Sequence, residues 1–422
     1  MYQAGPAGAL LRKRLKLPAS RFGWMNVAPT VLLLGITSLL ADVSAEMINT
    51  TLPLYMLVTL RLSPFQVGLT DGIYQGAAVV VSLLSGIVSD RWRRPKQIAA
   101  TGYALSAVSR LGLLTAVGWP AISGVVMADR IGKGIRTAPR DAMIAATSRA
   151  EELATSFGVH RALDTAGSMI GPLLAVLILT LAPERYDAIF IVSLCVGVIS
   201  VAVIGALVQD PTRAEAPGGT PPAPEPAITR QMVAGLLRQR DFRVLMLVGS
   251  GLALVTISDS LLYLALQRGV RLQPGMFPML YVVTAFGFMM FAIPAGRIAD
   301  RVGHGTTFLA GYVLLAAVYG MLLLPHPGYF VAIVALMMLG SYYAATDGVL
   351  MAMASRVLPA NLRATGLAML STATGLARLA ASALYGLAWS RYGATRALIV
   401  FGAGLMVAIG AGRWTLFRHS AE

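Results

Sequence analysis

The amino-acid sequence predicts an all-α membrane protein in which twelve transmembrane helices form two halves of six, related by a pseudo-two-fold axis. Composition is the first reason: 56% of the 422 residues are hydrophobic and only 13% are charged, and apolar stretches of about 18 or more residues indicate spanning helices. The second reason is a repeat. The stretch Gly86-Ile-Val-Ser-Asp90-Arg91 returns half a chain length later as Gly296-Arg-Ile-Ala-Asp300-Arg301. Such spacing is typical of membrane proteins built from two related halves.

The apolar runs give the spans in order, with boundaries good to about 2–4 residues. The predicted spans are 27–57, 65–89, 97–118, 120–143, 153–182, 187–208, 242–267, 274–299, 306–325, 328–352, 363–389 and 394–415. Arg and Lys are concentrated in alternate loops, and such loops stay on the cytoplasmic side of a membrane. The sequence therefore predicts a multi-pass protein of the bacterial inner (plasma) membrane with both termini in the cytoplasm.

The spans divide the chain into two bundles joined by a linker. The linker contains Pro at 211, 217, 221, 222, 224 and 226, so it can neither span a membrane nor pack as a regular helix. The predicted units are a basic cytoplasmic tail at 1–26, an N-terminal six-helix bundle at 27–208, the Pro-rich cytoplasmic linker at 209–241, a C-terminal six-helix bundle at 242–415 and a cytoplasmic tail at 416–422.

Other classes of protein fit the sequence poorly. The net charge of +15 is spread between apolar runs and not along one polar face, which argues against nucleic-acid binding. We find no nucleophile–base arrangement, phosphate-cradling loop or Cys/His metal spacing, so we expect neither an enzyme nor a cofactor. The lone Cys195 can form no internal disulfide. We expect a monomer without a bound metal, although the spacing of Glu46, His160 and Asp164 leaves a metal site open.

Ionisable side chains within the predicted spans are the strongest indication of a functional site, because a charge at bilayer depth is costly. Asp42 and Arg130 lie near the middle of their spans, and Glu46 lies one turn beyond Asp42. Arg130 is expected to balance Asp42 or Glu46. A third group follows on one side of the fifth span. It comprises His160, Arg161 and Asp164.

These groups are predicted to meet in one cavity of the N-terminal half. Carboxylates beside cations can bind protons reversibly, and a histidine beside them can relay protons. The residues predicted to couple transport to protons are Asp42, Glu46, His160 and Asp164. The alternative is a permanently paired network with a structural role.

Three further cations continue the fourth span within about one-sixth of a turn of each other: Lys133, Arg136 and Arg140. They fit either a vestibule that attracts an organic or phosphorylated anion, or pairs with Asp129, Asp141 and lipid head groups at the inner surface. Lys133 fits the vestibule better, whereas Arg136 and Arg140 fit the inner surface slightly better.

The C-terminal half contains fewer charges, which suggests that it contributes shape and apolar contacts. The aromatic pair Tyr342 and Tyr343 can contact an amphipathic or cationic substrate, but such a pair more often serves helix packing. The predicted substrate cavity is lined by Arg130, Lys133, Arg136, Arg161, Asp259, Tyr342, Tyr343, Asp347 and Arg378.

The motifs resemble those of the major facilitator superfamily over essentially the whole chain. The loop after the second span resembles motif A, with Gly86, Asp90, Arg91 and Arg94 in place and Arg93 where glycine is usual. The fourth span resembles motif B, with Arg130 followed by Gly134. The fifth resembles motif C of proton-coupled exporters, with Gly158, Gly167, Gly171 and Pro172, but Ala175 and Val176 replace its final glycines.

The resemblance implies mechanical roles for these motifs. Asp90 and its repeat at Asp300 are expected to close one face of the molecule by charge pairing, the alternative being that they only cap helices. The predicted gating residues are Gly86, Asp90, Arg91, Arg94, Gly296, Asp300 and Arg301. The glycines of motif C, with Pro172, are expected to allow a close, bent helix contact between the halves, or ordinary tight packing.

The sequence thus favours a secondary transporter that works by alternating access in a lipid bilayer on a small-molecule substrate. The leading expectation is a proton-coupled antiporter that exports an organic molecule or drug, as in the subgroup of unassigned and presumed drug exporters that the chain resembles. The alternative is a symporter or facilitator that imports an organic or phosphorylated anion. A non-transporting receptor and a lipid-moving protein are the remaining interpretations.

Overall fold

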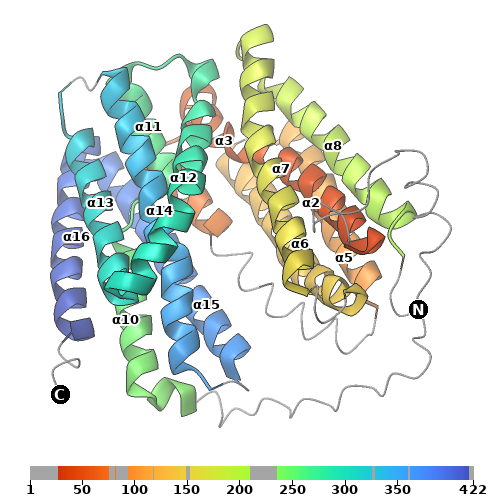
Figure 1. Ribbon diagram of the computed structural model, residues 1–422. Helices are drawn as coiled ribbons and strands as arrows, with labels where there is room; N and C mark the ends of the chain where they lie inside the picture. The colour runs from red at the N-terminus through yellow and green to blue at the C-terminus, as the bar shows by residue number, and fades with distance from the viewer. Residues whose placement is uncertain are drawn as a thin grey trace.

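The described part of the protein is built of helices. The computed structural model describes residues 27–75, 81, 94–116, 118–148, 153–209, 235–325, 328–359 and 362–417. No strand occurs within these ranges. The predicted all-α class is therefore confirmed, and the helices form two groups that lie beside each other (Figure 1).

The N-terminal group contains α2 (Pro29–Asn49), α3 (Leu52–Leu54), the π-helix η2 (Tyr55–Thr59), a helix at residues 64–75 that we call the 64–75 helix, α5 (Pro95–Thr115), α6 (Trp119–Thr147), α7 (Leu153–Leu181) and α8 (Tyr186–Ala206). Helix α2 packs against α7 and α8, and α5 packs against α6. Gly102 and Gly132 bring α5 and α6 together, because a Cβ on either would lie 2.7 Å from the carbonyl oxygen of the other.

The C-terminal group contains α10 (Arg240–Leu254), α11 (Asp259–Val270), the 3₁₀-helix η5 (Pro274–Met276), α12 (Met279–Val302), α13 (His304–Leu322), α14 (Tyr329–Val357), α15 (Arg363–Tyr392) and α16 (Ala394–Phe417). Here α14 packs against α12 and α13, while α10 packs against α15. The predicted linker lies largely outside the described residues, so the boundaries of the predicted units stay a prediction.

Nine helical stretches in the described ranges are long and apolar enough to cross a membrane. Three predicted spans are not among them. Most of the predicted span 65–89 lies outside the described residues, and α5 and α6 carry more polar side chains. The long helices α5 and α6 nevertheless lie alongside the others (Figure 1), which agrees with a membrane protein of twelve spanning segments.

The predicted span 242–267 is not continuous, because α10 ends at Leu254 and α11 begins at Asp259. The backbone groups freed at this break have local partners. The Tyr319 hydroxyl accepts the N–H of Ile257 at 2.7 Å, and the Thr256 hydroxyl donates to the carbonyl of Leu252 at 2.8 Å. A break inside the bilayer is tolerated where protein groups satisfy the backbone in this way.

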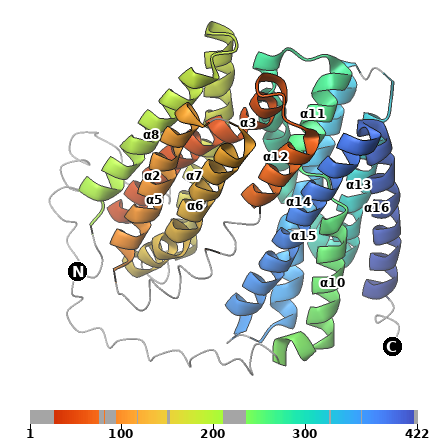
Figure 2. The same ribbon diagram turned by 180° about the vertical axis from the view of Figure 1, so that it is seen from behind.

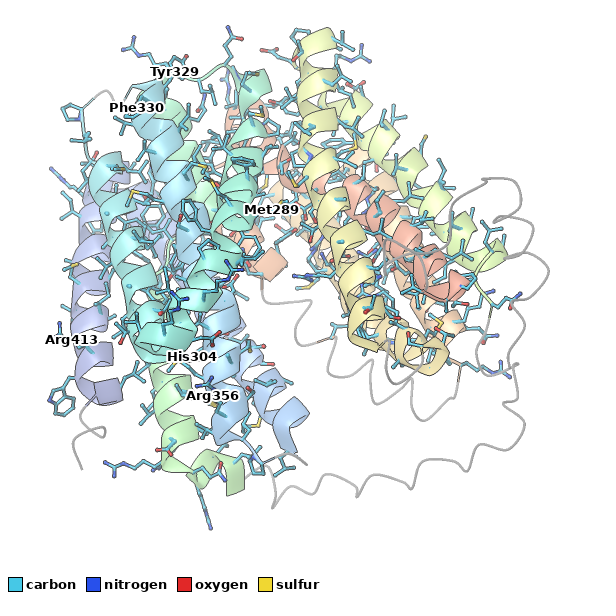
Figure 3. All side chains as sticks on the ribbon, in the orientation of Figure 1. Met289, His304, Tyr329, Phe330, Arg356 and Arg413 are labelled. Atoms are coloured by element: carbon cyan, nitrogen blue, oxygen red, sulfur yellow. The ribbon has the colours of Figure 1, made fainter. Side chains whose placement is uncertain are left out.

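The two halves meet at one end of the molecule and diverge toward the other (Figures 1 and 2). Contacts between the halves join α7 to α12 and η5, and α3 to α11. We call this the joined end, and the opposite one the separated end. Among the labelled side chains, Tyr329 and Phe330 lie at the joined end, and His304 and Arg356 lie at the separated end (Figure 3).

Candidate functional site

The main cluster of buried charges forms around Asp42 of α2. Arg136 of α6 donates a hydrogen bond from Nη2 to Asp42 Oδ1 at 2.9 Å, and Lys133 Nζ lies 3.8 Å from the same oxygen. The side chains of Asp42 and Arg136 are each only 3% exposed. The expectation that Arg136 lies at the inner membrane surface is therefore wrong. Arg136 instead lies in the bundle, with its guanidinium over the Tyr103 ring.

A second carboxylate, Asp164 of α7, lies within hydrogen-bonding range of Asp42. Its oxygens are 3.5 Å from Arg161 and 4.0 Å from Arg140, which also donates to Ser38 and Asp141. Two ionised carboxylates can only accept hydrogen bonds, so a direct bond between them needs a proton. The Asp42 cluster, as we call it, comprises Asp42, Lys133, Arg136, Arg140, His160 and Asp164.

Two members of this cluster have buried nitrogens without a hydrogen-bond partner among the described residues. The unpartnered nitrogens are Nε and Nη1 of Arg136 and both ring nitrogens of His160. His160 is 4% exposed, and its charged neighbours include Arg140, Asp42 and Arg161. Buried donors and acceptors without partners are costly, so these atoms are the places where water or a ligand would be bound.

Arg130 belongs to a different cluster, nearer the joined end. It pairs with its own neighbour Asp129, which also accepts a hydrogen bond from Arg110 at 3.3 Å. Its guanidinium lies 3.9 Å from the centre of the Tyr74 ring. The predicted pairing of Arg130 with Asp42 or Glu46 is therefore wrong.

Glu46 is separated from Asp42 as well. It accepts hydrogen bonds from Asn49 at 2.9 Å and from the Tyr74 hydroxyl at 3.3 Å. A cavity lies beside this second cluster, lined by the polar residues Asn49, Tyr74, Ser109, Arg110, Asp129 and Arg130 together with apolar residues. The predicted single cavity of the N-terminal half is thus two neighbouring clusters.

The C-terminal half contributes two polar pairs. Tyr343 of α14 donates a hydrogen bond to Asp259 at the start of α11. Arg378 of α15 lies 3.3 Å from Asp347 of α14, and both side chains are partly exposed. Tyr342 is fully buried between the rings of Tyr312 and Tyr343, which is a packing position and not a contact surface for a substrate.

The contact between the halves contains a carboxylate that sequence reasoning missed. Asp71 of the 64–75 helix accepts a hydrogen bond from Ser260 of α11 at 2.5 Å and lies 3.3 Å from Ser382 of α15. Asp71 could have been found by the rule that identified Asp42, since it lies within an apolar run. Arg110 and Tyr74 were missed because their importance depends on packing between helices. Asp129 was expected among the partners of Lys133, Arg136 and Arg140, but it pairs with Arg110 and Arg130.

Comparison with known proteins decides the family. The family model of the major facilitator superfamily matches residues 34–382. The chain belongs to the major facilitator superfamily. It is 27% identical, over 373 residues, to an uncharacterized MFS-type transporter of Methanocaldococcus jannaschii, with 86% of this chain and 89% of that protein covered. It is also 35% identical to an uncharacterized protein of Mycobacterium tuberculosis, over 37% of this chain and 38% of that protein.

Solved structures of transporters have the same fold. The nucleoside transporter NupG matches with a TM-score of 0.75 and 16% identity, covering 92% of this chain and 99% of that one. A point mutant of the peptide transporter POT in complex with sulfate reaches a TM-score of 0.77 at 12% identity, covering 96% of this chain and 97% of that one. These structures show the fold, and it is the match to the family model that makes the chain a membrane transporter and not an enzyme.

The residues that resemble the superfamily's motif A are only partly visible. Gly86, Asp90 and Arg91 lie outside the described residues. Arg94 is exposed and donates a hydrogen bond to Gln97 at 3.3 Å. In the repeat, Gly296 has open space where a Cβ would lie, Arg301 is exposed, and Asp300 lies 3.6 Å from His304. The predicted gating role of these residues stays a prediction.

The glycines that resemble the superfamily's motif C differ in how closely they pack against α2. A Cβ on Gly167 would lie 2.4 Å from the carbonyl oxygen of Leu39, and one on Gly171 would lie 2.7 Å from that of Val43. Both glycines therefore bring α7, which contains Pro172, against α2. The expected contact between the halves is instead a contact within the N-terminal half. Gly158 meets nothing within 4 Å and does not share this packing.

The described residues contain no group of three or more His, Cys, Asp or Glu side chains that could hold a metal ion. In particular, Glu46 hydrogen-bonds Tyr74 and Asn49, whereas Asp164 lies with Asp42. The metal site left open between Glu46, His160 and Asp164 is therefore absent from the described part of the chain.

Proposed function

We propose that this transporter is a proton-coupled antiporter that exports a small organic molecule by alternating access, with the Asp42–Asp164 pair as its proton site. The observation that carries the proposal is the position of these carboxyl groups, side by side within the bundle. Adjacent carboxylates in a poorly solvated site cannot both remain ionised without a penalty, so such a pair tends to take up one proton. Intramembrane carboxylates commonly mark proton pathways.

Lys133 is the side chain that would couple protonation of Asp42 to substrate binding. It is the more exposed of the two cations that contact Asp42, at 34% exposure and 3.8 Å. When Asp42 gains a proton, Lys133 and Arg136 lose part of their counter-charge. The site then changes its affinity for a charged or polar substrate, which is the linkage that an exchanger needs.

The proposed orientation has both termini in the cytoplasm of a bacterial cell. The separated end then faces the cytoplasm, in agreement with the predicted basic loops. The structure would then be the inward-facing state, in which the Asp42 cluster exchanges protons and substrate with the cytoplasm. The outward direction of transport is supported by the sequence resemblance of Gly158, Gly167, Gly171 and Pro172 to motif C of proton-coupled exporters, from which Ala175 and Val176 depart.

A second candidate function is the uptake of an organic or phosphorylated anion with protons. The unpartnered nitrogens of Arg136 and His160 favour it, because the two Arg136 nitrogens and one ring nitrogen of a neutral His160 carry N–H donors that an anionic group would satisfy. The cations Lys133, Arg136, Arg140 and Arg161 also outnumber the carboxylates of Asp42 and Asp164. An anion would bind best when the carboxyl pair carries its proton.

The two candidates differ in the direction of coupled flow. We would reconstitute the protein in liposomes containing a pH-sensitive dye and add tetraphenylphosphonium, as a lipophilic cation, or glycerol 3-phosphate, as an organic phosphate. For an antiporter, substrate and proton move in opposite directions, whereas a symporter moves both together. Asp42→Asn and Asp164→Asn should abolish the coupled proton flux, whereas Asp187→Asn, at an exposed position, should not. Coupled flux that survives in both cluster variants would contradict the proposed proton site.

A further inference from the structure

Backbones of the two halves touch directly where the 64–75 helix meets α15. A Cβ on Gly68 would lie 2.5 Å from the carbonyl oxygen of Ser382, and one on Gly72 would lie 2.9 Å from that of Leu379. On the other side, a Cβ on Gly386 would lie 2.6 Å from the carbonyl oxygen of Pro64. Glycines permit this approach because larger residues would hold the helices apart. The joined end is therefore closed by close packing at this contact.

Asp71 lies in the middle of this contact and hydrogen-bonds two elements of the opposite half. Ser260 of α11 donates to Oδ1 at 2.5 Å, and the hydroxyl of Ser382 lies 3.3 Å from Oδ2. Ser258, at the position before α11 begins, lies 3.2 Å from Ser382. Asp71 is thus a side chain of the N-terminal half that is bound by two helices of the C-terminal half.

The hydrogen-bond set around Asp71 fits a protonated carboxyl group. Ser382 has one hydroxyl proton, and its shortest contact is the carbonyl oxygen of Gly68 at 2.7 Å. If that proton goes to Gly68, the contact with Oδ2 of Asp71 has no donor unless Asp71 supplies one. A carboxylic acid that donates to the Ser382 oxygen and accepts from Ser260 satisfies Gly68, Ser382 and Asp71, with the Ser258 hydroxyl as a further hydrogen-bonding neighbour of Asp71 and Ser382.

The charges around Asp71 also favour a neutral group. On α11 the nearest acid is Asp259, bonded to Tyr343, and on α12 Tyr281 contacts Ser260. On the 64–75 helix itself Tyr74 bonds Glu46 of α2. The guanidinium of Arg378, one turn from Ser382 on α15, lies 3.3 Å from Asp347, and that of Arg130 pairs with Asp129. A buried carboxylate that no cation pairs with is costly.

We propose that Asp71 is a proton-operated latch between the halves, which holds the joined end closed while its carboxyl group is protonated and releases it on deprotonation. Loss of the proton removes the bond to Ser382 and places a negative charge between packed helices. Separation of the halves relieves that cost by exposing the carboxylate to water. Alkaline conditions at the joined end therefore favour opening. The link between the latch and proton coupling rests on the proposed function. The latch itself is tested separately, by measuring whether the two halves move apart at the joined end.

The test measures the separation of two spin labels at the joined end. Labels are attached to Pro183→Cys and Gln273→Cys, which lie on opposite halves near the joined end, after Cys195→Ala. With the protein in lipid nanodiscs, we expect the label distance to increase between mildly acidic and mildly alkaline pH. Asp71→Asn keeps the shape and the hydrogen bonds of the protonated acid, so its labels should stay at the short distance throughout. Asp187→Asn should respond to pH as the parent does.

Three outcomes would overturn the latch. They are a parent protein whose label distance does not change with pH, an Asp71→Asn variant that still opens, and a response lost in Asp259→Asn or Glu46→Gln but kept in Asp71→Asn. If Asp71→Asn does not fold, Ser260→Ala decides instead. It removes a hydrogen bond that holds Asp71 in the closed state, so opening should need less alkaline conditions and its midpoint should move to lower pH, and an unchanged midpoint would contradict the proposal.

The two proposals can fail separately. If the labels respond to pH through Asp71 but liposomes show no substrate-driven proton flux, then the latch holds and the antiporter proposal is wrong. If flux depends on Asp42 and Asp164 while Asp71→Asn opens normally, then the antiporter proposal holds and the latch is wrong.

Discussion

At the scale of single residues, the site depends on how each buried charge finds a partner. Arg136 and Asp42 are each 3% exposed and share a 2.9 Å contact. Removing one member of such a pair leaves the other as an uncompensated charge, which typically costs about 3–5 kcal/mol. The stability of the fold therefore depends on keeping both side chains. The presence of such a buried pair fits a role in binding or proton exchange.

This pairing gives the first prediction. Arg136→Met leaves Asp42 with Lys133 at 3.8 Å, so the free energy of unfolding should fall by about 3–5 kcal/mol. Adding Asp42→Asn should restore part of that loss, because the uncompensated carboxylate is then neutral. Thermal unfolding in detergent measures both effects. Arg161→Met, at a side chain that is 81% exposed, is the control and should change little. A double variant no more stable than Arg136→Met would contradict the pairing.

For single residues, the sequence could predict part of the site but not all of it. Helical spacing suggested that Asp42, Glu46, His160 and Asp164 lie together, because a residue's depth and face follow from its position in a span. The structure brings Asp42, His160 and Asp164 together, but Glu46 bonds Asn49 and Tyr74 instead. Helical spacing could not predict which charged side chains form ion pairs with each other. Arg130 lies about 120° around the helix from Arg136, and its bond to Asp129 depends on how α6 packs against α5.

At the scale of elements, glycines decide which helices touch. The spacing of Gly158, Gly167 and Gly171 suggested one packing stripe, yet only the last two face α2 closely. Spacing along α7 fixes the relative direction of these positions, but the close contact with α2 does not extend along the whole length of α7. The extent of the contact is a property of the pair of helices, which the sequence of one helix does not contain.

The second prediction follows from this difference. Gly167→Ala adds a Cβ that would lie 2.4 Å from a backbone oxygen, so α2 and α7 must move apart, at a cost of about 1–3 kcal/mol. Gly158→Ala adds a Cβ in open space and should leave stability unchanged or raise it by about 0.5–1 kcal/mol, because alanine favours the helix. Melting temperatures of the two variants provide the comparison. Equal losses in both would show that the glycines act as one stripe after all.

The sequence did not predict the break between α10 and α11, because residues 242–267 form a mainly apolar pattern that predicts one span. It becomes possible because Tyr319, on α13, offers a hydroxyl to the freed backbone at Ile257. That partner is 62 residues away in the chain, and no local pattern indicates it.

The third prediction concerns this partner. Tyr319→Phe leaves the N–H of Ile257 without its acceptor in a buried position, which should cost about 1–3 kcal/mol. Amide hydrogen exchange should become faster at residues 255–258 while α16 is unaffected. Tyr312→Phe, at another buried tyrosine of α13, serves as the matched control. Exchange at the break that is unchanged in Tyr319→Phe would mean that other groups hold it.

At the scale of the whole molecule, the two halves resemble each other in sequence but differ in chemistry. The Asp42 cluster lies entirely in the N-terminal half, whereas the C-terminal half contributes the Arg378–Asp347 and Tyr343–Asp259 pairs. The predicted division of labour, with protons handled by the N-terminal half and shape and apolar contacts supplied by the C-terminal half, stays a prediction. The duplication could be predicted from the repeated Gly-x-x-x-Asp-Arg motif, but the conformation could not, because one sequence must form both inward-facing and outward-facing states.

The orientation of the molecule in its membrane gives the last prediction. If both termini are cytoplasmic, the joined end faces outward, and a cysteine at Pro183 should react with a membrane-impermeant maleimide on intact cells. Cysteines at Ala146 and Val302, exposed near the separated end, should react only after the cells are permeabilised. Cys195 is exposed and is first replaced by alanine. The reverse pattern would place the separated end outside. The same structure would then be outward-facing, and the proposed latch at Asp71 would respond to cytoplasmic and not to external pH.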